Sequence, residues 1–395
     1  MRVLFVCDDP LIPINSGGRR EIVGEINGLR KIGHTVTLVI FHHKGALSAE
    51  MKLRHKKKFG KTIFIPRLGV VGATILRPLL PYQLSSRRIS REDSALSWIG
   101  PQDIVIAQHE WTLPAAAKIA RGLSRPLVLR SHNDPTKYLR ALYVHAHGFR
   151  KLYFFAELVR VRRCIKPIFY NPVSEIYPIS RGDKAAYDGL GVRVHTLAPV
   201  LFEGGATRRV GAPKNNSIAY VGAMDMPHAL NGLLWFIRDV FPLVRAAIPG
   251  ATLNVAGRRA TPQVTDLLRN FEGISFVGEI NDASSFLLNA RVFINPVFDG
   301  SGINMKVGPP ASIGLPIVST SLGIRGLDAL DDGVAKADDP VEFAARVVQL
   351  LASDDDWLLS SERLISAIER YSADQIGIEL SKRLESHIKT MQSAS

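Results

Sequence analysis

The sequence predicts an α/β protein built from two Rossmann-like, doubly wound domains that face one another across a cleft. In both halves of the chain, short apolar runs typical of buried strands alternate with amphipathic helical segments. The alternation pauses once, over residues 197–216, in a stretch rich in Gly and Pro, and then starts afresh. The length of 395 residues allows two or three domains of roughly 150 residues each.

The first half opens with a strand, a helix and a parallel strand. Val3–Cys7 is a short apolar run, Arg20–Lys31 places apolar residues at helical spacing, and Thr35–Phe41 is a second apolar run. Two further strands, in IVIAQ and PLVLRSHND, end in polar residues. Strand ends line the ligand crevice of an open parallel sheet, so these polar residues are candidates for a site.

The second half repeats the pattern. Strands are expected in SIAYVGA, ATLNVAG, ISFVGEI, VFINPV and PIVST, and helices over Leu230–Ile248, near Thr261–Asn270, over Asn281–Ala290 and towards the C-terminus. We therefore expect an N-terminal domain over residues 1–200 and a C-terminal domain over 201–372. A last helix, over 373–395, is expected to pack back towards the N-terminal domain.

Composition excludes several classes of protein. Apolar residues make up 46% and charged residues 22%, which argues against long disordered stretches. No apolar run approaches the roughly 18 residues of a spanning helix, and Asp8 and Asp9 interrupt any early hydrophobic signal. We expect a cytoplasmic protein that can be peripheral on the inner face of the membrane. Cys7 and Cys164 form no disulfide framework or metal-ligand spacing, and no metal site is expected.

The two halves differ in charge. Residues 1–200 hold 32 Lys and Arg against 14 Asp and Glu, whereas residues 201–395 hold 18 against 22. From residue 51 to 91 there are 11 basic residues and no acidic one. Such a surface attracts phosphate groups, an anionic membrane or nucleic acid, or is simply a solvated loop. No nucleic-acid-binding module is recognisable, so we expect no nucleic-acid partner.

The segment Phe149–Arg163 is an aromatic and cationic helix. Such a helix can lie on a membrane. The alternative, which we favour at this point, is that its apolar side packs within the domain.

Several motifs resemble one family. In the second half they are YVGAMDMPHALNGLLWFIRDVFPLV, ATLNVAG, the stretch from FVGEI to GIRGL, and DDPVEFAARVVQLL; in the first half they are Gly17-Gly18, IGHTVTLV, LVLRSHN and IYPISRGD. In combination the chain resembles glycosyltransferase family 4, retaining enzymes of the GT-B fold, in the branch with a G-S-G-x-x-x-K donor loop.

The resemblance implies transfer of a hexose from a nucleotide diphosphate sugar, held by the C-terminal domain, to a cell-surface glycan, glycolipid or lipid-linked acceptor held by the N-terminal domain. It implies no catalytic metal, and no cofactor besides the nucleotide sugar that is the donor substrate. In chemical terms, a diphosphate needs backbone N–H groups and a cation. The loop Gly300–Lys306 offers both, so we assign donor-binding roles to a set of residues in and around it: Asp299, Ser301, Gly302, Asn304 and Lys306.

The loop departs from the family's pattern. Ser301 and Pro309 stand where family members usually carry two glutamates, the second of which usually holds the donor ribose. Asp299 is the expected substitute as a hydroxyl acceptor. Because proline is favoured at a first helical position, we predict that a helix starts at Pro309 and that Lys306 lies in non-helical backbone.

Other candidates follow from the same resemblance or from strand ends. His132 matches a family histidine beside the transferred sugar and is the predicted catalytic residue, while His109, Arg130 and Asp134 are assigned to the acceptor or to orienting the histidine. The set is completed by three glycines that are expected to let the backbone approach the donor, and by one position near the nucleotide base of the donor: Gly17, Gly18, Gly222 and Ile280.

Two alternatives remain open. Pro309 favours a catalytically degenerate GT-B subunit that binds a partner or glycan, and donor hydrolysis would separate it from an active transferase. A nucleotide-sugar epimerase on the same fold would release a changed nucleotide sugar without an acceptor.

Overall fold

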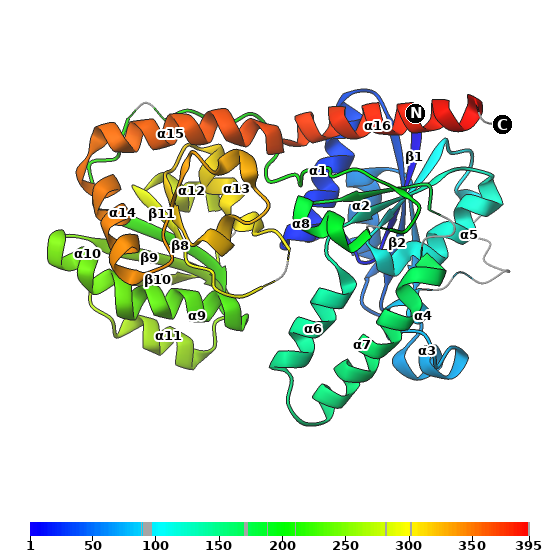
Figure 1. The fold of residues 1–395 in the computed structure, drawn as a ribbon, viewed down its shortest axis with the longest axis horizontal. Coiled ribbons are helices and arrows are strands. Elements are labelled where there is room, and N and C mark those ends of the chain that lie inside the picture. The colour runs from blue at the N-terminus through cyan, green and yellow to red at the C-terminus, as the bar shows by residue number, and fades with distance from the viewer. Residues whose placement is uncertain are drawn as a thin grey trace. The chain divides into compact units, whose positions relative to one another are not determined.

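The computed structural model describes residues 1–87, 89, 97–169, 173–187, 189–209, 211–280, 283–300 and 302–393 (Figure 1). The chain forms two compact units: unit 1 comprises Met1–Val200 and Ala373–Ser395, and unit 2 comprises Leu201–Ser372. Each unit is described by itself.

Unit 1 is built on a seven-stranded parallel sheet of order β3-β2-β1-β4-β5-β6-β7. The chain reverses its direction of winding between β1 and β4, so the sheet is doubly wound as predicted. The strand bounds are β1 Arg2–Cys7, β2 Thr35–His42, β3 Thr62–Pro66, β4 Ile104–Gln108, β5 Leu127–Ser131, β6 Glu175–Pro178 and β7 Arg193–Val194.

Helices cover both faces of this sheet, and each face has its own apolar core. One core packs α1 against β1, β2 and the C-terminal helix, and the other packs α5 and the inner half of α7 against the opposite face. The helices of unit 1 are α1 Gly17–Lys31, α2 Ala49–Phe59, α3 Val70–Leu76, α4 Tyr82–Ser86, α5 Leu113–Leu123, α6 Pro135–His145, α7 Gly148–Phe169, α8 Arg181–Lys184 and α16 Ala373–Ser393, with 3-10 turns η2 Glu110–Thr112 and η3 Ala185–Tyr187.

The C-terminal helix α16 packs on α1, the helix that follows the first strand (Figure 1). Two glycines make the close crossing possible, because a Cβ on Gly28 would overlap the carbonyl oxygen of Ala373 and a Cβ on Gly377 would overlap the backbone of Gly28. The last residues of the chain therefore complete the core of its first domain.

Unit 2 is built on a six-stranded parallel sheet of order β10-β9-β8-β11-β12-β13, with the reversal of winding between β8 and β11. The strands are β8 Ser217–Ala223, β9 Thr252–Arg258, β10 Ile274–Gly278, β11 Val292–Asn295, β12 Ile317–Ser319 and β13 Val334–Lys336. This second sheet confirms the prediction of two Rossmann-like domains.

The helices of unit 2 follow the predicted order. They are α9 Pro227–Trp235, α10 Phe241–Ala247, α11 Pro262–Arg269, α12 Ala283–Leu288, α13 Gly308–Ser312, α14 Pro340–Ala352 and α15 Asp354–Ile368, with 3-10 turns η5 Met305–Val307, η6 Ser321–Ile324, η7 Asp328–Leu330 and η8 Glu369–Tyr371. The single helix predicted over Leu230–Ile248 contains a π-helical turn, η4 Phe236–Val240, between α9 and α10. Pro242 follows this turn and has no N–H to donate to the preceding turn, which gives the local widening a cause.

The chain passes from unit 1 to unit 2 within the stretch 197–216, where Leu197 and Val200 are buried in the core of unit 1 and Leu201 is buried in unit 2. One expectation is corrected. In α7, Leu158 and Val161 pack inside unit 1, but Phe149 and Leu152 at its start do not. Among the described residues, no helix combines the length and apolarity needed to cross a bilayer.

Candidate functional site

Open parallel sheets bind ligands outside the carboxyl ends of their strands, where the winding reverses. In unit 2 this place lies between β8 and β11, and in unit 1 between β1 and β4. Most of the residues predicted from the sequence follow these strand ends, so each unit has its own candidate site.

The donor loop of unit 2 follows β11 and depends on two glycines with positive φ. Gly300 has φ 133° and Gly302 has φ 79°, conformations that side chains rarely adopt. Arg325, which sequence reasoning missed, holds the loop: its Nη2 donates to the carbonyl oxygens of Gly300 at 3.2 Å and Gly302 at 3.0 Å. Ser301 lies outside the described residues.

Asn304 ties the far end of the loop to the sheet. Its Nδ2 donates to Oδ1 of Asn295 at 3.0 Å, and its Oδ1 accepts from the backbone N–H of Lys306 at 3.3 Å. Asn295 is itself fixed, because its Nδ2 donates to the Ser319 hydroxyl and to the carbonyl of Gly323, both at 3.0 Å. Asn304 therefore positions the backbone of Lys306 and has its amide occupied by protein.

Lys306 is a cation without an anionic partner in the described part of the chain. Its Nζ lies 4.6 Å from the centre of the Tyr220 ring on β8, and no carboxylate of the described residues is within ion-pair distance. Burial lowers the pKa of Lys306 to about 7. A lysine ammonium group that lacks a counter-charge among the described residues is protonated more readily beside a bound anion, so this part of unit 2 favours an anionic ligand.

The backbone prediction for this segment was wrong in detail. The helix α13 begins at Gly308, so Pro309 is its second residue, and Lys306 lies in the 3-10 turn η5 rather than in non-helical backbone. The physical reason for the proline still applies, because N–H groups throughout a first helical turn have no partner within the helix. The first residue of the helix is a glycine because a Cβ on Gly308 would crowd the backbone of Leu201.

The other predicted donor residues have less direct support. A Cβ on Gly222 would lie 2.8 Å from the ring of Tyr220, so this glycine makes room for the residue under Lys306. The carboxylate of Asp299 accepts from the N–H of Gly300 at 2.7 Å, which stabilises the loop. Ile280 is half-buried beyond the end of β10.

His132 follows β5 in unit 1 and is held by both ring nitrogens. Nδ1 lies 3.1 Å from Oε2 of Glu21, and Nε2 lies 2.8 Å from Oε1 of Gln108, whose own Nε2 donates to Glu25 at 2.6 Å. Because both neighbours present acceptors, both ring nitrogens donate and the ring is an imidazolium. Burial lowers the pKa of His132, but the charge and hydrogen bond of Glu21 outweigh it, and the pKa is raised. The side chain is therefore a fixed cation.

Arg130, on the same strand, closes this network. Its Nε donates to Glu25 at 2.6 Å and its Nη2 to Glu21 at 2.5 Å, while its remaining N–H groups reach carbonyl oxygens of Tyr177, Leu197 and Ala198. All five donors of the guanidinium group are used, so none is left for an acceptor substrate. Two carboxylates on α1 and two cations at the end of β5 thus balance one another in a buried quartet.

His109 has the more accessible ring of the two predicted histidines. It follows β4 with φ 82°, a strained conformation for a residue other than glycine. Its ring stacks on that of His132, with centroids 5.9 Å apart and planes at 7°, and on Trp111 at 5.4 Å. Its side chain is 18% exposed, and Nδ1 lies 2.9 Å from Glu110. Strain retained at a strand end is typical of functional sites, which favours His109 as the residue that meets a ligand.

Sequence reasoning also missed a charged cluster beside the histidines. Asp8 and Asp9 follow β1; Asp8 pairs with Arg87 at 3.4 Å, and Asp9 pairs with Arg19 at 2.6 Å and with Arg67 at 3.4 Å. Burial raises the pKa of Asp8, but Arg87, His109 and Arg67 outweigh it and lower the pKa overall. Asp8 is therefore a carboxylate at the carboxyl end of the sheet, where it can accept hydrogen bonds.

Two further predictions concern helix ends. Asp134 caps α6 by accepting from the N–H groups of Thr136 at 2.8 Å and Lys137 at 3.3 Å, which accounts for its position without a substrate. Gly17 and Gly18 begin α1, and a Cβ on Gly18 would meet no atom within 4 Å. Packing among the described residues therefore does not require a glycine at this position.

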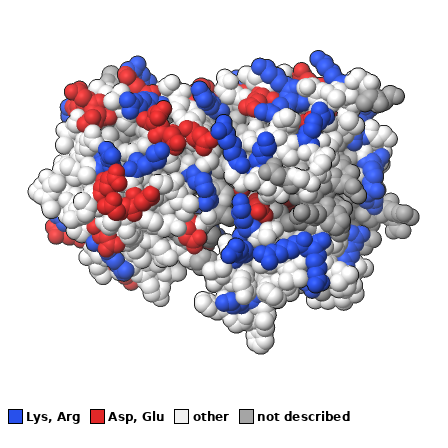
Figure 2. All heavy atoms as spheres, in the orientation of Figure 1, with Lys and Arg blue, Asp and Glu red and all other residues white. Residues whose placement is uncertain are grey.

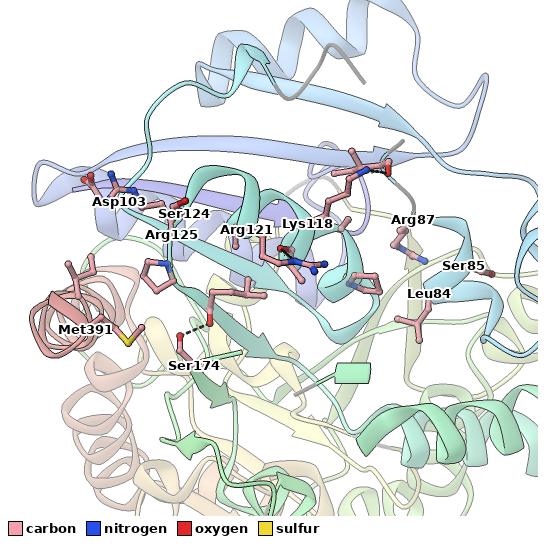
Figure 3. A pocket seen from close by; sticks show the side chains of 18 of the residues that line it. Leu84, Ser85, Arg87, Asp103, Lys118, Arg121, Ser124, Arg125, Ser174 and Met391 are labelled. Carbon is pink, nitrogen blue, oxygen red and sulfur yellow. Dashed lines mark hydrogen bonds between the residues drawn. The ribbon is translucent and has the colours of Figure 1, made fainter. Parts of the chain in front are cut away.

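A separate cavity of about 1220 Å³ lies along α5 in unit 1 (Figure 3). Its lining includes five cations: Arg77, Arg87, Lys118, Arg121 and Arg125. Some of them are engaged within the protein, because Lys118 donates to the carbonyl of Ile89 at 2.8 Å and Nε of Arg121 donates to that of Ala117 at 3.3 Å. Asp103, the acidic residue among the described lining residues, pairs with Arg2 at 2.7 Å. The cavity extends to the start of β5 and to α16, and none of the predicted site residues lines it.

Among the described residues, no group of three or more His, Cys, Asp or Glu side chains is arranged to hold a metal ion. Cys7 and Cys164 are both free and buried.

Comparison with known proteins links unit 2 to a family. Residues 215–353, which include the donor loop and Lys306, match the model of the family described as "Glycosyl transferases group 1". A protein of Klebsiella pneumoniae, named "Uncharacterized 44.6 kDa protein in cps region", is 25% identical over 359 residues, which cover 88% of this chain and 90% of that protein.

Two solved structures match both units. Anabaena HepE in complex with UDP matches with a TM-score of 0.63 at 12% identity, covering 98% of this chain and 100% of that one. The pneumococcal O-GlcNAc transferase GtfA in complex with UDP and GlcNAc matches with a TM-score of 0.66 at 9% identity, covering 98% and 99%. The fold is therefore the GT-B fold that the sequence resemblance implied.

Proposed function

We propose that this chain is a retaining, metal-independent glycosyltransferase of group 1, in the branch with a G-S-G-x-x-x-K donor loop. It moves a hexose from a UDP-sugar, bound by unit 2, to a cell-surface glycan, glycolipid or lipid-linked acceptor, bound by unit 1. The observation that carries the proposal is Lys306: a half-buried lysine without a carboxylate partner among the described residues, in the loop that follows β11 at the switch point of a parallel sheet, within the segment that matches the family model.

In this proposal Lys306 faces the diphosphate. Transfer breaks the bond between the sugar C1 and the diphosphate oxygen, and the electron pair leaves with the nucleotide. C1 bonds to the oxygen of the acceptor hydroxyl, whose proton passes to the departing diphosphate. Negative charge grows on the leaving diphosphate, and a cation in a site of low polarity stabilises that charge most strongly in the transition state. Arg325 and Asn304 serve as positioning residues, because they fix the loop that carries Lys306.

Unit 1 supplies the acceptor side of the reaction. His132 stays the proposed catalytic residue, acting through its positive charge and its backbone at the strand end, because both ring nitrogens are engaged. His109 and Asp8 are the side chains best placed to contact acceptor hydroxyls, since His109 is the more exposed histidine and Asp8 is a carboxylate beside it.

The comparisons support the choice of substrates. HepE and GtfA were both solved in complex with UDP, which favours a UDP-sugar as donor here. The Klebsiella relative is named for the cps region, which favours an acceptor in capsular polysaccharide synthesis.

Thermal unfolding with a panel of UDP-, GDP- and dTDP-sugars tests the donor. A ligand at about 100 times its Kd stabilises the protein by roughly 2.7 kcal/mol, which is readily measured as a rise in Tm. We expect the largest rise with a UDP-sugar and its loss in Lys306→Met. Lys336→Met, which removes an exposed lysine from the same unit, is the matched control and should keep the rise. A panel without any rise would refute the proposal.

Pro309 favours one other function, a degenerate subunit that binds a glycan or partner without catalysis, because a proline cannot replace the carboxylate that family members use for the donor ribose. That protein would bind acceptor glycans and release no sugar from any donor. Hydrolysis of a UDP-sugar, monitored as release of free UDP, separates the two functions.

A further inference from the structure

One side of unit 1 carries large apolar side chains that the protein leaves uncovered. In α7 and at the end of α6, Phe149 is 91% exposed, Leu152 is 67% exposed, and Phe155 and Val144 are more than half exposed. In and after α3, Val71, Ile75 and Leu79 are exposed to a similar degree. Single exposed apolar residues are common on soluble proteins, but a cluster over two elements, the α6–α7 hairpin and the α3 segment, marks an interaction surface.

These two elements belong to the same part of unit 1. The hairpin of α6 and α7 projects from the unit with α3 beside it, and both lie at its lower edge in Figure 1. The contacts agree: the thiol of Cys164 on α7 donates to the carbonyl of Leu79 at 3.6 Å, and Glu157 on α7 accepts from the N–H of Tyr82 at 2.8 Å. We call the seven exposed residues the hairpin face: Val71, Ile75, Leu79, Val144, Phe149, Leu152 and Phe155.

The hairpin is anchored at its base and open at its tip. Leu158 and Val161 in the inner half of α7 are buried in the core of unit 1. Towards the tip, the rings of Tyr143 and Phe155 lie 5.9 Å apart, and Nζ of Lys151 lies 5.3 Å from the Tyr143 ring. The tip is thus braced by contacts between its two helices, while the apolar side chains of the hairpin face point away from the core.

Positive charge surrounds the hairpin face. Residues 135–164 contain seven Lys and Arg and a single acidic residue, and residues 51–91 around α3 contain no acidic residue at all. The one acidic residue, Glu157, is buried and accepts from Arg160 at 2.7 Å, so it contributes no free negative charge. Figure 2 shows Lys and Arg gathered above the projecting hairpin.

We propose that the hairpin face docks unit 1 onto an anionic lipid bilayer. Phe, Leu, Ile and Val side chains of α3, the end of α6 and the first half of α7 would enter the headgroup region, and the flanking Lys and Arg would remain at the anionic surface. A protein partner is the less fitting occupant, because the cores of protein interfaces are depleted of charged residues, whereas cations flank this face in both segments. The inference goes beyond the proposed transferase activity and does not require it.

Flotation of the full chain with vesicles tests the proposal. Vesicles of phosphatidylcholine with about 30% phosphatidylglycerol should carry the protein upwards at low salt, and pure phosphatidylcholine should carry much less. Raising the salt to about 0.5 M should weaken binding without abolishing it, because salt screens the charges and leaves apolar insertion in place.

The double variant Phe149→Ser and Leu152→Ser should lower the partition coefficient by about tenfold or more for each side chain removed. The matched control is Leu243→Ser with Val341→Ser, which removes two exposed apolar residues from unit 2, where Val341 is 69% exposed, and should float like the wild type. Because Phe149 and Leu152 are exposed, the variant should keep the Tm of the wild type, and its rise in Tm with UDP-glucose should be unchanged.

Three outcomes would overturn the proposal: wild-type protein that ignores anionic vesicles, flotation that is the same in both double variants, or a hairpin variant that changes oligomeric state in solution while flotation stays unchanged. The last outcome would identify the face as a protein interface. Failure of UDP-glucose to bind the wild type would refute the donor assignment and leave the docking result standing.

Discussion

The affinity for a UDP-sugar should fall steeply as the pH rises from 6 to 9, because of Lys306. Burial lowers the pKa of this lysine to about 7 in the free protein, from an ordinary value of 10.5. A diphosphate beside the ammonium group favours the charged form and returns the pKa towards its ordinary value. Since binding raises the pKa, the complex takes up a proton, and by linkage the affinity declines once the pH exceeds the pKa of the free protein.

The magnitude follows from the two pKa values. With a pKa of about 7 in the free protein and 10.5 in the complex, Kd at pH 7 should be twice its limiting value at low pH. Between pH 6 and pH 9 Kd should rise about ninetyfold, which is about 2.7 kcal/mol of binding free energy at 1.36 kcal/mol for each pKa unit. At pH 7.5 binding should take up about 0.8 proton. UDP-glucose suits the experiment because its diphosphate is esterified at both ends and does not titrate in this range.

Isothermal titration calorimetry measures both quantities. Kd is determined at several pH values, and proton uptake is obtained from the dependence of the apparent enthalpy on the ionisation enthalpy of the buffer. Lys306→Met should bind about 10 to 150 times more weakly than the wild type at pH 6, the cost of about 1.5–3 kcal/mol for a lost charge-assisted hydrogen bond, and should show little pH dependence. A wild-type Kd that stays flat from pH 6 to 9, or the same slope in the variant, would refute the reasoning.

Three further changes have defined outcomes. His132→Ala should lower kcat for transfer much more than it weakens donor binding; an unchanged kcat in a folded variant would limit this histidine to a structural role. Arg130→Met removes the partner of two buried carboxylates, Glu21 and Glu25, and should lower the free energy of unfolding by about 3–5 kcal/mol in urea titrations. A loss below about 1 kcal/mol would contradict the buried network. Gly377→Ala should destabilise unit 1 by about 1–3 kcal/mol because the added Cβ would overlap Gly28 on α1, and an unchanged Tm would contradict that close crossing.

The contribution of His132 to the free energy of unfolding should fall as the pH rises. The pKa of His132 is raised in the folded protein, so its charge stabilises the fold at acidic pH, and this contribution is lost as the pH rises from the unfolded value of about 6.5 through the folded value. Urea titrations of the wild type and His132→Ala should converge at alkaline pH. A difference that stays constant with pH would show that the ring is neutral.

The strands and helices were predictable because a buried parallel strand is a short apolar run and its crossover helix has an apolar stripe. Val3–Cys7 and Thr35–Phe41 illustrate this, and the structure extends each run by one residue. The crossing of α1 and α16 was not predictable at the level of contacts. Gly28 and Gly377 lie about 350 residues apart, and nothing local in the sequence shows that each glycine makes room for the other.

The loop Gly300–Lys306 was predicted to bind the donor because glycine and lysine at that spacing suggest phosphate chemistry, and this role stays a prediction. Arg325, which donates to two carbonyl oxygens of this loop, was missed because it lies in a turn after the next strand, β12. Glu21 and Glu25 were missed because a carboxylate on a helix is usually solvated. One signal was available: both lie one turn apart on α1, among the apolar residues that pack on the sheet, where a charge requires a partner.

Turnover of the donor tests the central claim most directly. The purified chain is incubated with UDP-glucose and related UDP-hexoses, and free UDP is measured with time, with Lys306→Met as the paired sample. The account predicts slow release of UDP from at least one UDP-hexose by the wild type, faster release when a capsular glycan or lipid-linked acceptor is added, and neither in the variant. The account would be contradicted by a folded wild-type protein whose Tm rises with no nucleotide sugar and that releases no nucleotide, with or without acceptor.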